Sequence, residues 1–301
     1  EVNRRERMEV RGLGERQETL RAAMSEPFAN RFDLERQVHA GAMAKVFCAR
    51  DGATGLRVAL KIPVQSDDAE LERFEQEGQI LAGFEHPGIV RYVAHDSRDL
   101  DLAFLATEWL DGETLFARLR RGRLRIAEAV GLIRRITEAL VVVHRARVVR
   151  RDVKPTNVML CGRDSSVKLL DFGIARRDTG TGMNCHASFG GGTWAYMSPE
   201  QVMGAAELGA RTDVFSLGCV LFECLTGKRA FPSDRSSAMV AKVFRDPPEL
   251  DAVCRNPHPG LARLIASMLA KDPLARPADA SALLQAIDAL GSLPNTPAVL
   301  R

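Results

Sequence analysis

Residues 148–173 read VVRRDVKPTNVMLCGRDSSVKLLDFG, a stretch in which two short apolar runs each lead to an acidic residue. Asp152 follows the first run, and Lys154 and Asn157 come soon after it. Asp171 follows the second run, in the tripeptide DFG. Carboxylate and amide oxygens are the hard ligands that Mg²⁺ prefers, so we expect Asn157 and Asp171 to hold this metal. Asp152 is then available to take a proton from a hydroxyl group, and the whole set suits phosphoryl transfer.

These motifs resemble the catalytic loop and the metal-binding loop of eukaryotic-like (Hanks-type) serine/threonine protein kinases of bacteria. A D-x-K-x-x-x-N match also arises by chance, but the DFG at the family's distance and the SPE at 198–200 argue against chance. The resemblance covers residues 31–290. It implies an α+β, bilobal protein-kinase fold, with a small antiparallel β-sheet N-lobe that carries one helix (αC) and a larger, mainly helical C-lobe.

The composition is that of an ordinary globular chain. Its 301 residues are 46% hydrophobic and 27% charged, enough for one large domain or two lobes. A formal net charge of +3, with acids and bases interleaved, gives no indication of nucleic-acid binding. The six cysteines include no C-x-x-C and lie mostly in apolar runs, so we expect reduced core residues. Cys185-His186 has no partner pair at ligand spacing, and we expect no metal there.

The ends and boundaries of the chain can be estimated from composition. No apolar run approaches the roughly 18–20 residues of a membrane helix, and no signal peptide is visible. We therefore expect a cytoplasmic location for this fragment, although the start at Glu1 leaves open that it is cut from something longer. We expect four parts: a charged extension or linker at 1–30, the N-lobe at 31–108, the C-lobe at 109–290 and a C-terminal linker at 291–301.

The turn HAGAMAKVF occupies the place where the family has G-x-G-x-x-G-x-V, whose backbone amides cover the ATP phosphates. Aligned on Val46, this chain has His39, Gly41 and Ala44, so the middle glycine alone is kept. Gly41 is the position where a side chain would most hinder close approach to a phosphate. We expect a workable but less mobile loop, with Gly41 and Val46 among the ATP-binding residues.

The segment VALK at 58–61 matches the family's V-A-I-K. The match implies that Lys61 pairs with the α- and β-phosphates of ATP and that Ala59 lines the same site. A lysine at the end of a strand is by itself more often an exposed edge residue. The element that follows decides between these two interpretations.

Residues 67–84 have the apolar spacing of a helix, and RFEQEGQIL resembles helix αC of the family. Glu77 shares the apolar face of this helix, whereas Glu75 lies about 200° around it. We therefore take Glu77 as the ion-pair partner of Lys61. Gly78 costs the helix roughly 1 kcal/mol, and we expect it to loosen the helix.

An apolar strand over 102–109 leads into Glu108-Trp109-Leu110, which resembles the hinge between the lobes. In the family the hinge backbone hydrogen-bonds adenine, so the resemblance places Glu108 and Leu110 among the ATP-binding residues. It also places Thr107 at the back of the adenine pocket. Helical spacing of apolar residues follows and indicates the C-lobe.

The catalytic loop departs from the family at one position. Arg150 stands where the family usually has the histidine of His-Arg-Asp, while Arg151 is kept. In the family this kept arginine binds a phosphate on the activation loop. The lost histidine normally packs beneath Phe172, so Arg150 must either pack its methylene groups there or point outward. Lys154 marks a Ser/Thr rather than a Tyr kinase and would neutralise charge on the transferring phosphoryl group.

Residues 174–192 are polar and glycine-rich, which is typical of an activation loop, and they hold three candidate phosphorylation sites, Thr179, Thr181 and Ser188. The segment GTWAYMSPE at 192–200 closely resembles the family's G-T-x-x-Y-M-A-P-E. It implies that Thr193 touches Asp152 and Lys154 in the substrate site.

Two further motifs have structural roles in the resembled family. Glu200 of SPE would be buried against Arg276 of DPLARP, in a pair that is costly to break from one side. Asp213 of DVFSLG matches the start of helix αF and would hold the backbone of the catalytic loop.

Three functions remain in view. The leading one is an active serine/threonine protein kinase with ATP and Mg²⁺ as cofactors, in which Asp152 is the base and Lys61 and Lys154 place charge. It would act on protein substrates, including its own activation loop, and self-association for trans-phosphorylation is common in the family. A pseudokinase that serves as a scaffold would explain the missing glycines and histidine. A small-molecule kinase of the aminoglycoside phosphotransferase type shares part of the fold, but GTWAYMSPE argues against it.

Overall fold

The structure, a computed structural model, describes residues 27–41, 44–64, 68–98, 102–162, 166–172, 176–177, 193–232, 234, 237, 241–242, 245–255 and 257–300. The chain divides into two compact units. Unit 1 comprises Glu1–Ala82 and Arg91–Leu110, and unit 2 comprises Gly83–Val90 and Asp111–Arg301. Each unit is described by itself.

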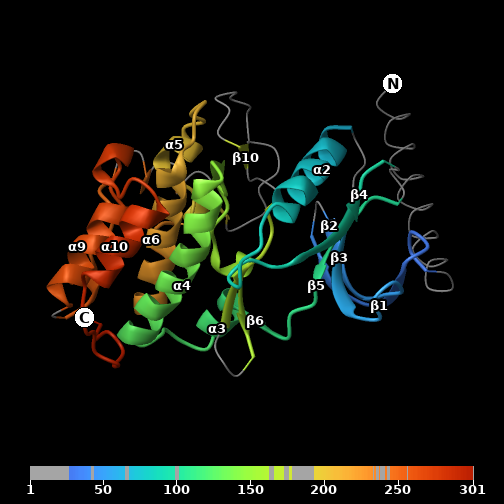
Figure 1. Cartoon of the computed structure of the whole chain (residues 1–301). Helices are drawn as coiled ribbons and strands as arrows, with labels where there is room; N and C mark the ends of the chain where they lie inside the picture. The colour runs from blue at the N-terminus through green and yellow to red at the C-terminus, as the bar shows by residue number, and fades with distance from the viewer. Residues whose placement is uncertain are drawn as a thin grey trace. The chain divides into compact units, whose positions relative to one another are not determined.

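Unit 1 is built on a five-stranded sheet in the order β1-β2-β3-β5-β4, in which all neighbouring strands are antiparallel (Figure 1). Helix α2 follows β3 and packs on β4 and β5. The sheet with its helix confirms the expected β-rich part of an α+β fold. The elements are β1 (Phe32–Ala40), β2 (Ala44–Asp51), β3 (Arg57–Pro63), α2 (Asp68–Ala82), β4 (Tyr92–Asp96) and β5 (Phe104–Glu108).

The two faces of this sheet carry different side chains because successive residues of a strand point to opposite sides. One face is apolar and forms the core of unit 1, with buried residues that include Phe47, Leu60 and Phe104. The opposite face carries Val46 and Lys61, which are directly paired across β2 and β3. The predicted ATP-binding side chains of these strands therefore share the face that is not used for the core.

The apolar core of unit 1 also includes a residue from outside the expected N-lobe. Phe28 is buried, its ring centroid lies 6.3 Å from that of Phe104, and its backbone forms a bridge with Phe32. Phe28 thus belongs to this core although it precedes residue 31, where the sequence places the start of the N-lobe. The isolated Phe28 follows a long charged segment, and its apolar partners lie in strands that are distant in sequence.

Helix α2 packs closely on β4 through its glycine. A Cβ atom built on Gly78 would lie 2.4 Å from Cγ of His95, well inside van der Waals contact. The His95 ring is in turn held by the hydroxyl of Tyr92, 2.7 Å from Nδ1, and by Oε1 of Glu75, 3.3 Å from Nε2. Gly78 thus permits a close contact between helix and strand, which the expectation of a looser helix did not include.

This contact predicts an unusual response to a helix-favouring substitution. By helix propensity alone, Gly78→Ala would stabilise α2 by about 1 kcal/mol. Because the new methyl group overlaps the His95 ring, we expect Gly78→Ala to lower the free energy of unfolding by about 1–3 kcal/mol in urea denaturation. The same substitution in a His95→Ala background should become stabilising. A stabilising effect in both backgrounds would show that the close contact does not exist.

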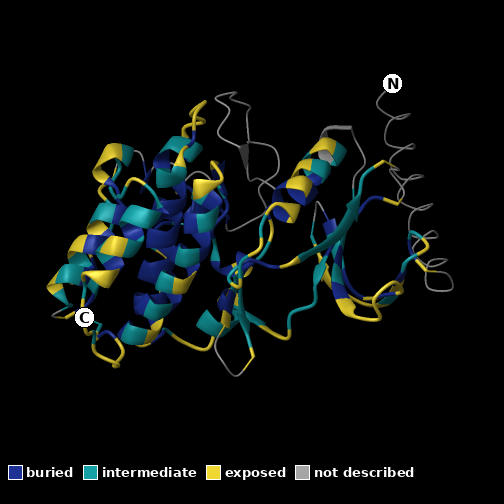
Figure 2. Ribbon diagram, in the orientation of Figure 1, coloured by how far each residue is buried: buried dark blue, intermediate teal, exposed yellow. Residues whose placement is uncertain are grey.

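Unit 2 is mainly helical, and α6 is its centre (Figures 1 and 2). Every residue of α6 from 212 to 226 is buried, and α4, α9 and α10 pack against it. Gly227 ends the helix with a φ of 71°, a backbone conformation that favours glycine. The elements are β6 (Gly112–Thr114), α3 (Leu115–Leu119), α4 (Ile126–Arg145), β7 (Val148–Val149), β8 (Val158–Cys161), β9 (Ser166–Leu169), β10 (Arg176–Arg177), α5 (Pro199–Val202), α6 (Ala210–Thr226), α8 (Leu250–Val253), α9 (Pro259–Met268) and α10 (Ala280–Asp288), with 3₁₀ turns at Pro155–Asn157, Thr193–Ala195 and Pro273–Ala275.

Two small antiparallel sheets of unit 2 hold the loops of interest. One has the order β6-β8-β9, and the other pairs β7 with β10. The predicted catalytic loop begins directly after β7, and the predicted metal-binding loop begins directly after β9. The short apolar runs that the sequence shows before each acid are therefore these strands.

The C-terminal segment, which the sequence predicts to be a linker, forms hydrogen bonds within unit 2. The N–H groups of Ile126 and Ala127, at the start of α4, donate to the carbonyls of Thr296 (2.9 Å) and Pro294 (3.2 Å). The N–H of Arg255 donates to the carbonyl of Val299 at 2.6 Å. The first N–H groups of a helix have no partner within the helix, and the tail supplies acceptors for two of them.

Within the described part of the chain, no helix combines the length and the apolar character that crossing a bilayer requires. Five cysteines lie in this part, all as free thiols, and four of them are buried. The pKa values of the Cys219 and Cys224 thiols are raised by burial, which makes these side chains inert core residues.

Candidate active site

The loop after β7 is fixed by a buried carboxylate of α6. Asp213 accepts hydrogen bonds from the backbone N–H of Arg150 at 2.8 Å and of Arg151 at 2.7 Å. His144 Nε2 lies 3.0 Å from the same carboxylate, and because its Nδ1 accepts from the N–H of Ala280, Nε2 carries the ring proton. Arg151 adopts a left-handed φ of 65°, which costs a non-glycine residue about 1–2 kcal/mol. The bonds to Asp213 hold the loop in this strained conformation.

Asp152 lies in this loop with its two carboxylate oxygens in different environments. Oδ2 accepts from Asn157 Nδ2 at 2.8 Å and lies 2.8 Å from Nζ of Lys154. Oδ1 is buried and makes no hydrogen bond to any described residue. Oδ2 is therefore fixed by two donors, while Oδ1 is a hydrogen-bond acceptor that no described residue uses.

Lys154 connects this loop to the segment that resembles G-T-x-x-Y-M-A-P-E. Its Nζ donates to Oγ1 of Thr193 at 3.0 Å, and Thr193 is itself buried. The structure thus brings Asp152, Lys154 and Thr193 together, with Lys154 as the link between the other two.

The metal-binding loop is tied to the catalytic loop by its backbone. The N–H of Leu170 donates to the carbonyl of Asn157 at 2.9 Å, which places Asp171 one residue beyond this contact. Asp171 is exposed and has a left-handed φ of 53°. Asn157 and Asp171 are the two residues predicted to bind Mg²⁺, and their amide and carboxylate oxygens are a donor set that suits this ion.

Arg150 occupies the position of the missing histidine in an unexpected way. It is fully buried, its guanidinium carbon lies 5.2 Å from the ring centroid of Phe172, and its Nη2 donates to the carbonyl of Asp171 at 2.8 Å. A guanidinium over an aromatic face is a favourable cation–π contact. Arg150 therefore neither points outward nor packs by its methylene groups alone: its charged end holds the metal-binding loop.

In unit 1, Lys61 and Glu77 form an ion pair from β3 to α2. Nζ of Lys61 lies 3.0 Å and 2.8 Å from the two oxygens of Glu77, whose side chain is only 3% exposed. Glu75 instead contacts Gln79, Ser97 and His95. The helical-face argument thus selects the acid that the structure pairs with Lys61.

The remaining predicted ATP-binding residues lie on the same unit. Gly41 donates its N–H to the carbonyl of Ala44 at 2.9 Å and closes the base of the glycine-loop turn, whose tip lies outside the described residues. Ala59 pairs with Cys48, and Val46 with Lys61, on one face of the sheet.

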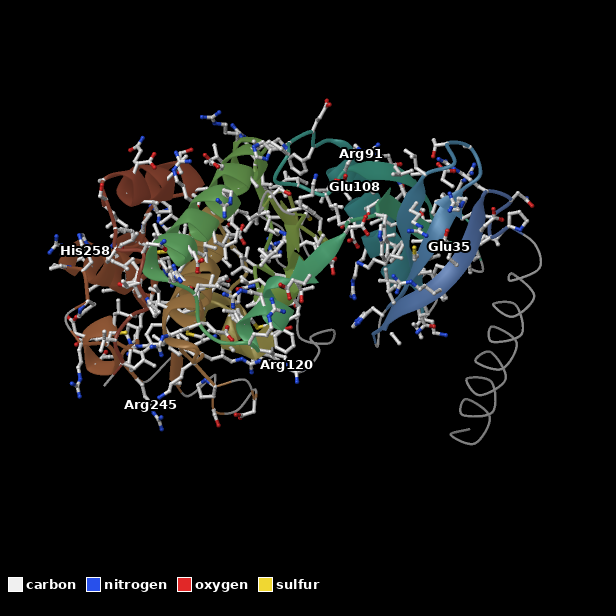
Figure 3. The ribbon with its side chains drawn as sticks, turned by 90° about the horizontal axis from the view of Figure 1, so that it is seen from below. Glu35, Arg91, Glu108, Arg120, Arg245 and His258 are labelled. Carbon is white, nitrogen blue, oxygen red and sulfur yellow. The ribbon has the colours of Figure 1, made fainter. Side chains whose placement is uncertain are left out.

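The predicted hinge is connected to the sheet of unit 1 by backbone hydrogen bonds. The N–H of Glu108 donates to the carbonyl of Arg91, and Oε1 of Glu108 accepts from the N–H of Arg91 at 2.8 Å (Figure 3). Leu110 is half-buried. These bonds set the direction of the chain where it leaves β5.

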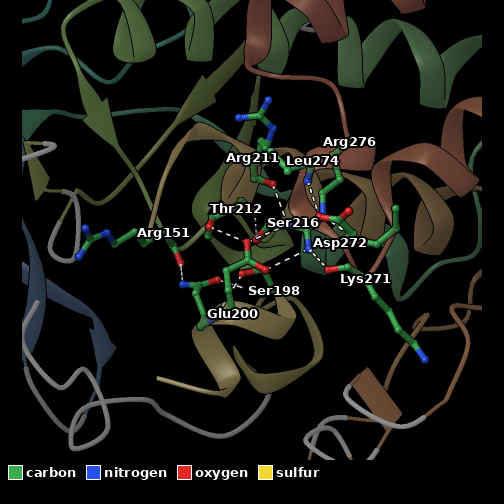
Figure 4. A network of polar contacts seen from close by, with 12 residues as sticks. Arg151, Ser198, Glu200, Arg211, Thr212, Ser216, Lys271, Asp272, Leu274 and Arg276 are labelled. Carbon is green, nitrogen blue, oxygen red and sulfur yellow. Dashed lines mark hydrogen bonds and ion pairs between the residues drawn. The ribbon is translucent and has the colours of Figure 1, made fainter. Parts of the chain in front are cut away.

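Glu200 and Arg276 form a bidentate pair in unit 2, in which Arg276 is buried and Glu200 is largely shielded from solvent (Figure 4). Nη1 and Nη2 of Arg276 donate to the two oxygens of Glu200 at 2.7 Å and 2.9 Å, and Thr212 adds a third hydrogen bond. Burial raises the pKa of Glu200, but the hydrogen bonds and the charge of Arg276 lower it by a larger amount. The pKa of Glu200 therefore lies below its ordinary value. The Glu200 end of α5 is thereby fixed to the turn that follows α9.

The sequence interpretation missed several anchors of the segment 193–198. The hydroxyl of Tyr196 donates to Glu223 at 2.6 Å, and its carbonyl accepts from Ser216 at 2.8 Å. Burial raises the pKa values of both Tyr196 and Glu223. Ser216 and Glu223 lie on the buried helix α6. In the sequence, the only sign of their role as anchors is that they are polar residues within an apolar run.

Some predicted sites fall outside the described residues. These are the candidate phosphorylation sites Thr179, Thr181 and Ser188 and the dipeptide Cys185-His186. Arg151, the predicted phosphate receptor, is described and half-buried, and its carbonyl accepts from Gln201 at 2.9 Å.

Comparison with known proteins gives a consistent picture. The family described as the protein kinase domain matches residues 32–286. The probable serine/threonine-protein kinase SCO3848 of Streptomyces coelicolor is 35% identical over 263 residues, which cover 83% of this chain and 38% of the relative. Serine/threonine-protein kinase PknA of Mycobacterium tuberculosis is 34% identical over 82% of this chain and 58% of its own length. Serine/threonine-protein kinase pkn2 of Myxococcus xanthus is 31% identical over 87% and 32%. The chain thus spans 32–58% of the length of these relatives.

Proposed function

This chain belongs to the protein kinase family, and from that premise we propose that it is a serine/threonine kinase catalytic domain. It transfers the γ-phosphoryl group of ATP to serine and threonine hydroxyl groups of proteins. The observation that carries this proposal is the asymmetry of the Asp152 carboxylate. Its Oδ2 is fixed by Asn157 and Lys154, whereas its Oδ1 is buried and accepts no hydrogen bond from the described residues.

In the proposed mechanism, Oδ1 of Asp152 accepts the proton of the substrate hydroxyl. The hydroxyl oxygen forms its bond to the γ-phosphorus while the bond from that phosphorus to the ADP oxygen breaks. Lys154, bonded to both Asp152 and Thr193, places positive charge beside the hydroxyl and its base. The bonds of the catalytic loop to Asp213 keep these groups in place before the substrate arrives.

ATP and Mg²⁺ are the cofactors in this proposal. Asn157 and Asp171 hold Mg²⁺, which when bound neutralises charge on the phosphates. Lys61, oriented by Glu77, binds the α- and β-phosphates. Gly41, Val46 and Ala59 line the nucleotide site, and the backbone of Glu108 and Leu110 contacts adenine.

The substrates we propose are proteins, among them other copies of this chain. Thr179, Thr181 and Ser188 are the acceptor candidates, and Arg151 is the receptor for a phosphate placed there. This calls for transient self-association. The free, buried cysteines support a reducing, cytoplasmic site of action. We also propose that the chain acts in signalling. The scaffold alternative rested partly on Arg150, and the contacts of Arg150 with Phe172 and Asp171 do not favour it.

Incubation of the purified chain with Mg-ATP, followed by intact mass and phosphosite mapping, tests this function. We expect added phosphate within residues 174–192 and none in an Asp152→Asn variant. Thermal stabilisation by Mg-ATP without any phosphate transfer to the chain or to added protein would instead support the scaffold function.

The ion pair of unit 1 offers a prediction with a matched control two residues away. Glu77→Gln removes the charged partner of Lys61, so we expect kcat/KM for ATP to fall roughly 10- to 100-fold. Glu75→Gln changes a carboxylate of the same helix whose partners are Gln79, Ser97 and His95, and it should leave kcat/KM nearly unchanged. Steady-state kinetics at varied ATP measure both. Equal losses in the two variants would mean that helix stability, and not the pairing of Lys61, is what these acids provide.

A further inference from the structure

A buried lysine lies beneath the segment 193–198. Lys242 is 1% exposed, and its Nζ donates to the backbone carbonyl of Trp194 at 2.5 Å. The same Nζ lies 4.9 Å from the ring centroid of Phe231 and 5.7 Å from that of Phe215. These two rings are stacked on each other with centroids 5.6 Å apart. The ammonium group thus has one hydrogen-bond acceptor and two aromatic faces.

No carboxylate among the described residues forms an ion pair with this lysine, since the nearby charges serve other partners. Arg276, whose guanidinium lies 4.8 Å from the Phe215 centroid, is paired with Glu200. Glu223 of α6 accepts from Tyr196. Cys219 of α6 also faces Lys242, and its thiol pKa is raised to about 12. Burial lowers the pKa of Lys242 to about 8.

Burying a lysine without an acid is costly, so an apolar residue would serve packing better. What an apolar residue cannot supply is the hydrogen bond to Trp194. Thr193 is held by Lys154, and Tyr196 is held by α6. The carbonyl of Trp194, which lies between these two residues in the sequence, is held by Lys242.

We propose that Lys242 is a positioning residue for the protein substrate. By holding the Trp194 carbonyl, it sets the path of the backbone that follows Thr193, and thereby the surface on which the substrate lies beside its reacting hydroxyl. This inference rests on the proposed kinase function and assigns part of its substrate recognition to a residue that touches neither ATP nor the catalytic loop.

The kinetic test compares Lys242→Met with Lys271→Met, which removes a partly exposed lysine whose Nζ lies 3.4 Å from Oδ1 of Asp246. The protein substrate is the inactive Asp152→Asn chain. Lys242→Met fills the same volume but cannot donate, and we expect KM for the protein substrate to rise roughly 10-fold. KM for ATP and ATP hydrolysis without protein substrate should stay within about 2-fold of the unsubstituted chain. An unchanged KM for the protein substrate would overturn the proposal. So would an equal impairment of KM for ATP and of ATP hydrolysis without protein substrate.

A second readout does not depend on catalysis. The chain has two tryptophans, so Trp109→Phe leaves Trp194 as a sole fluorescent reporter. We expect its emission to change with a midpoint near pH 8, as Lys242 loses its charge, and to lose this titration in the Lys242→Met variant. If the titration occurs but no phosphate is transferred, the anchoring of Trp194 stands and the kinase function fails. If the emission is independent of pH and of Lys242→Met, the anchoring is wrong whatever the activity.

Discussion

Asp152→Asn is expected to lower kcat for protein phosphorylation by roughly 10²- to 10⁴-fold, the usual contribution of a general base. The amide keeps the size of the carboxylate and can still lie beside Asn157 and Lys154, but it cannot take the proton of the substrate hydroxyl. Nucleotide binding does not use this proton. Quenched-flow or steady-state phosphorylation assays at saturating Mg-ATP measure the loss.

The matched measurement is the thermal shift caused by Mg-ATP, which should be similar in the Asp152→Asn variant and in the unsubstituted chain. Retention of kcat within about 10-fold would exclude Asp152 as the base. Loss of the thermal shift together with activity would mean that Asp152 organises the nucleotide site instead.

Arg276→Met is expected to lower the free energy of unfolding by about 3–5 kcal/mol, because Glu200 is left as a buried charge without its partner. The loss should be largest near neutral pH. Glu200 has a lowered pKa in the folded state, so the pair stabilises the fold above the ordinary glutamate pKa of about 4.3. This stabilisation disappears as the pH falls through the folded-state pKa. Urea denaturation at several pH values from neutral to well below the ordinary glutamate pKa measures the trend.

Two variants make this result interpretable. Arg276→Met combined with Glu200→Leu removes both charges and should recover most of the stability, since an apolar pair carries no desolvation cost. Arg134→Met breaks an exposed pair with Asp288 and should change stability little. If Arg276→Met were no worse than Arg134→Met, the pair between Glu200 and Arg276 would be energetically irrelevant.

The sequence alone points to the groups of the proposed catalytic loop because they lie close together in the chain. Asp152, Lys154 and Asn157 span six positions, and their mutual bonds follow from one loop. Helix geometry, a local property, separates Glu77 from Glu75 in agreement with the family position of Glu77. The motifs of Glu200 and Arg276 are far apart, and for them the family resemblance was required.

What the sequence could not provide depends on contacts between distant segments. Gly78 suggests a weak helix until the position of His95 is known. Lys242 lies in an ordinary stretch, and its importance comes from the Trp194 carbonyl, a group that every residue possesses. Arg150 allowed two interpretations, and the choice depends on how Phe172 packs.

The hydrogen bonds from the start of α4 to the C-terminal segment extend the folded domain beyond the residues that match the family. The residues that fold together and the residues that share the family's sequence therefore have different ends. The family match ends at residue 286, yet the carbonyls of Pro294 and Thr296 complete a helix that begins at Ile126. On the other side, Phe28 joins the core before the match begins at residue 32. Recombinant forms trimmed to the homologous segment would therefore lack part of the cooperative unit.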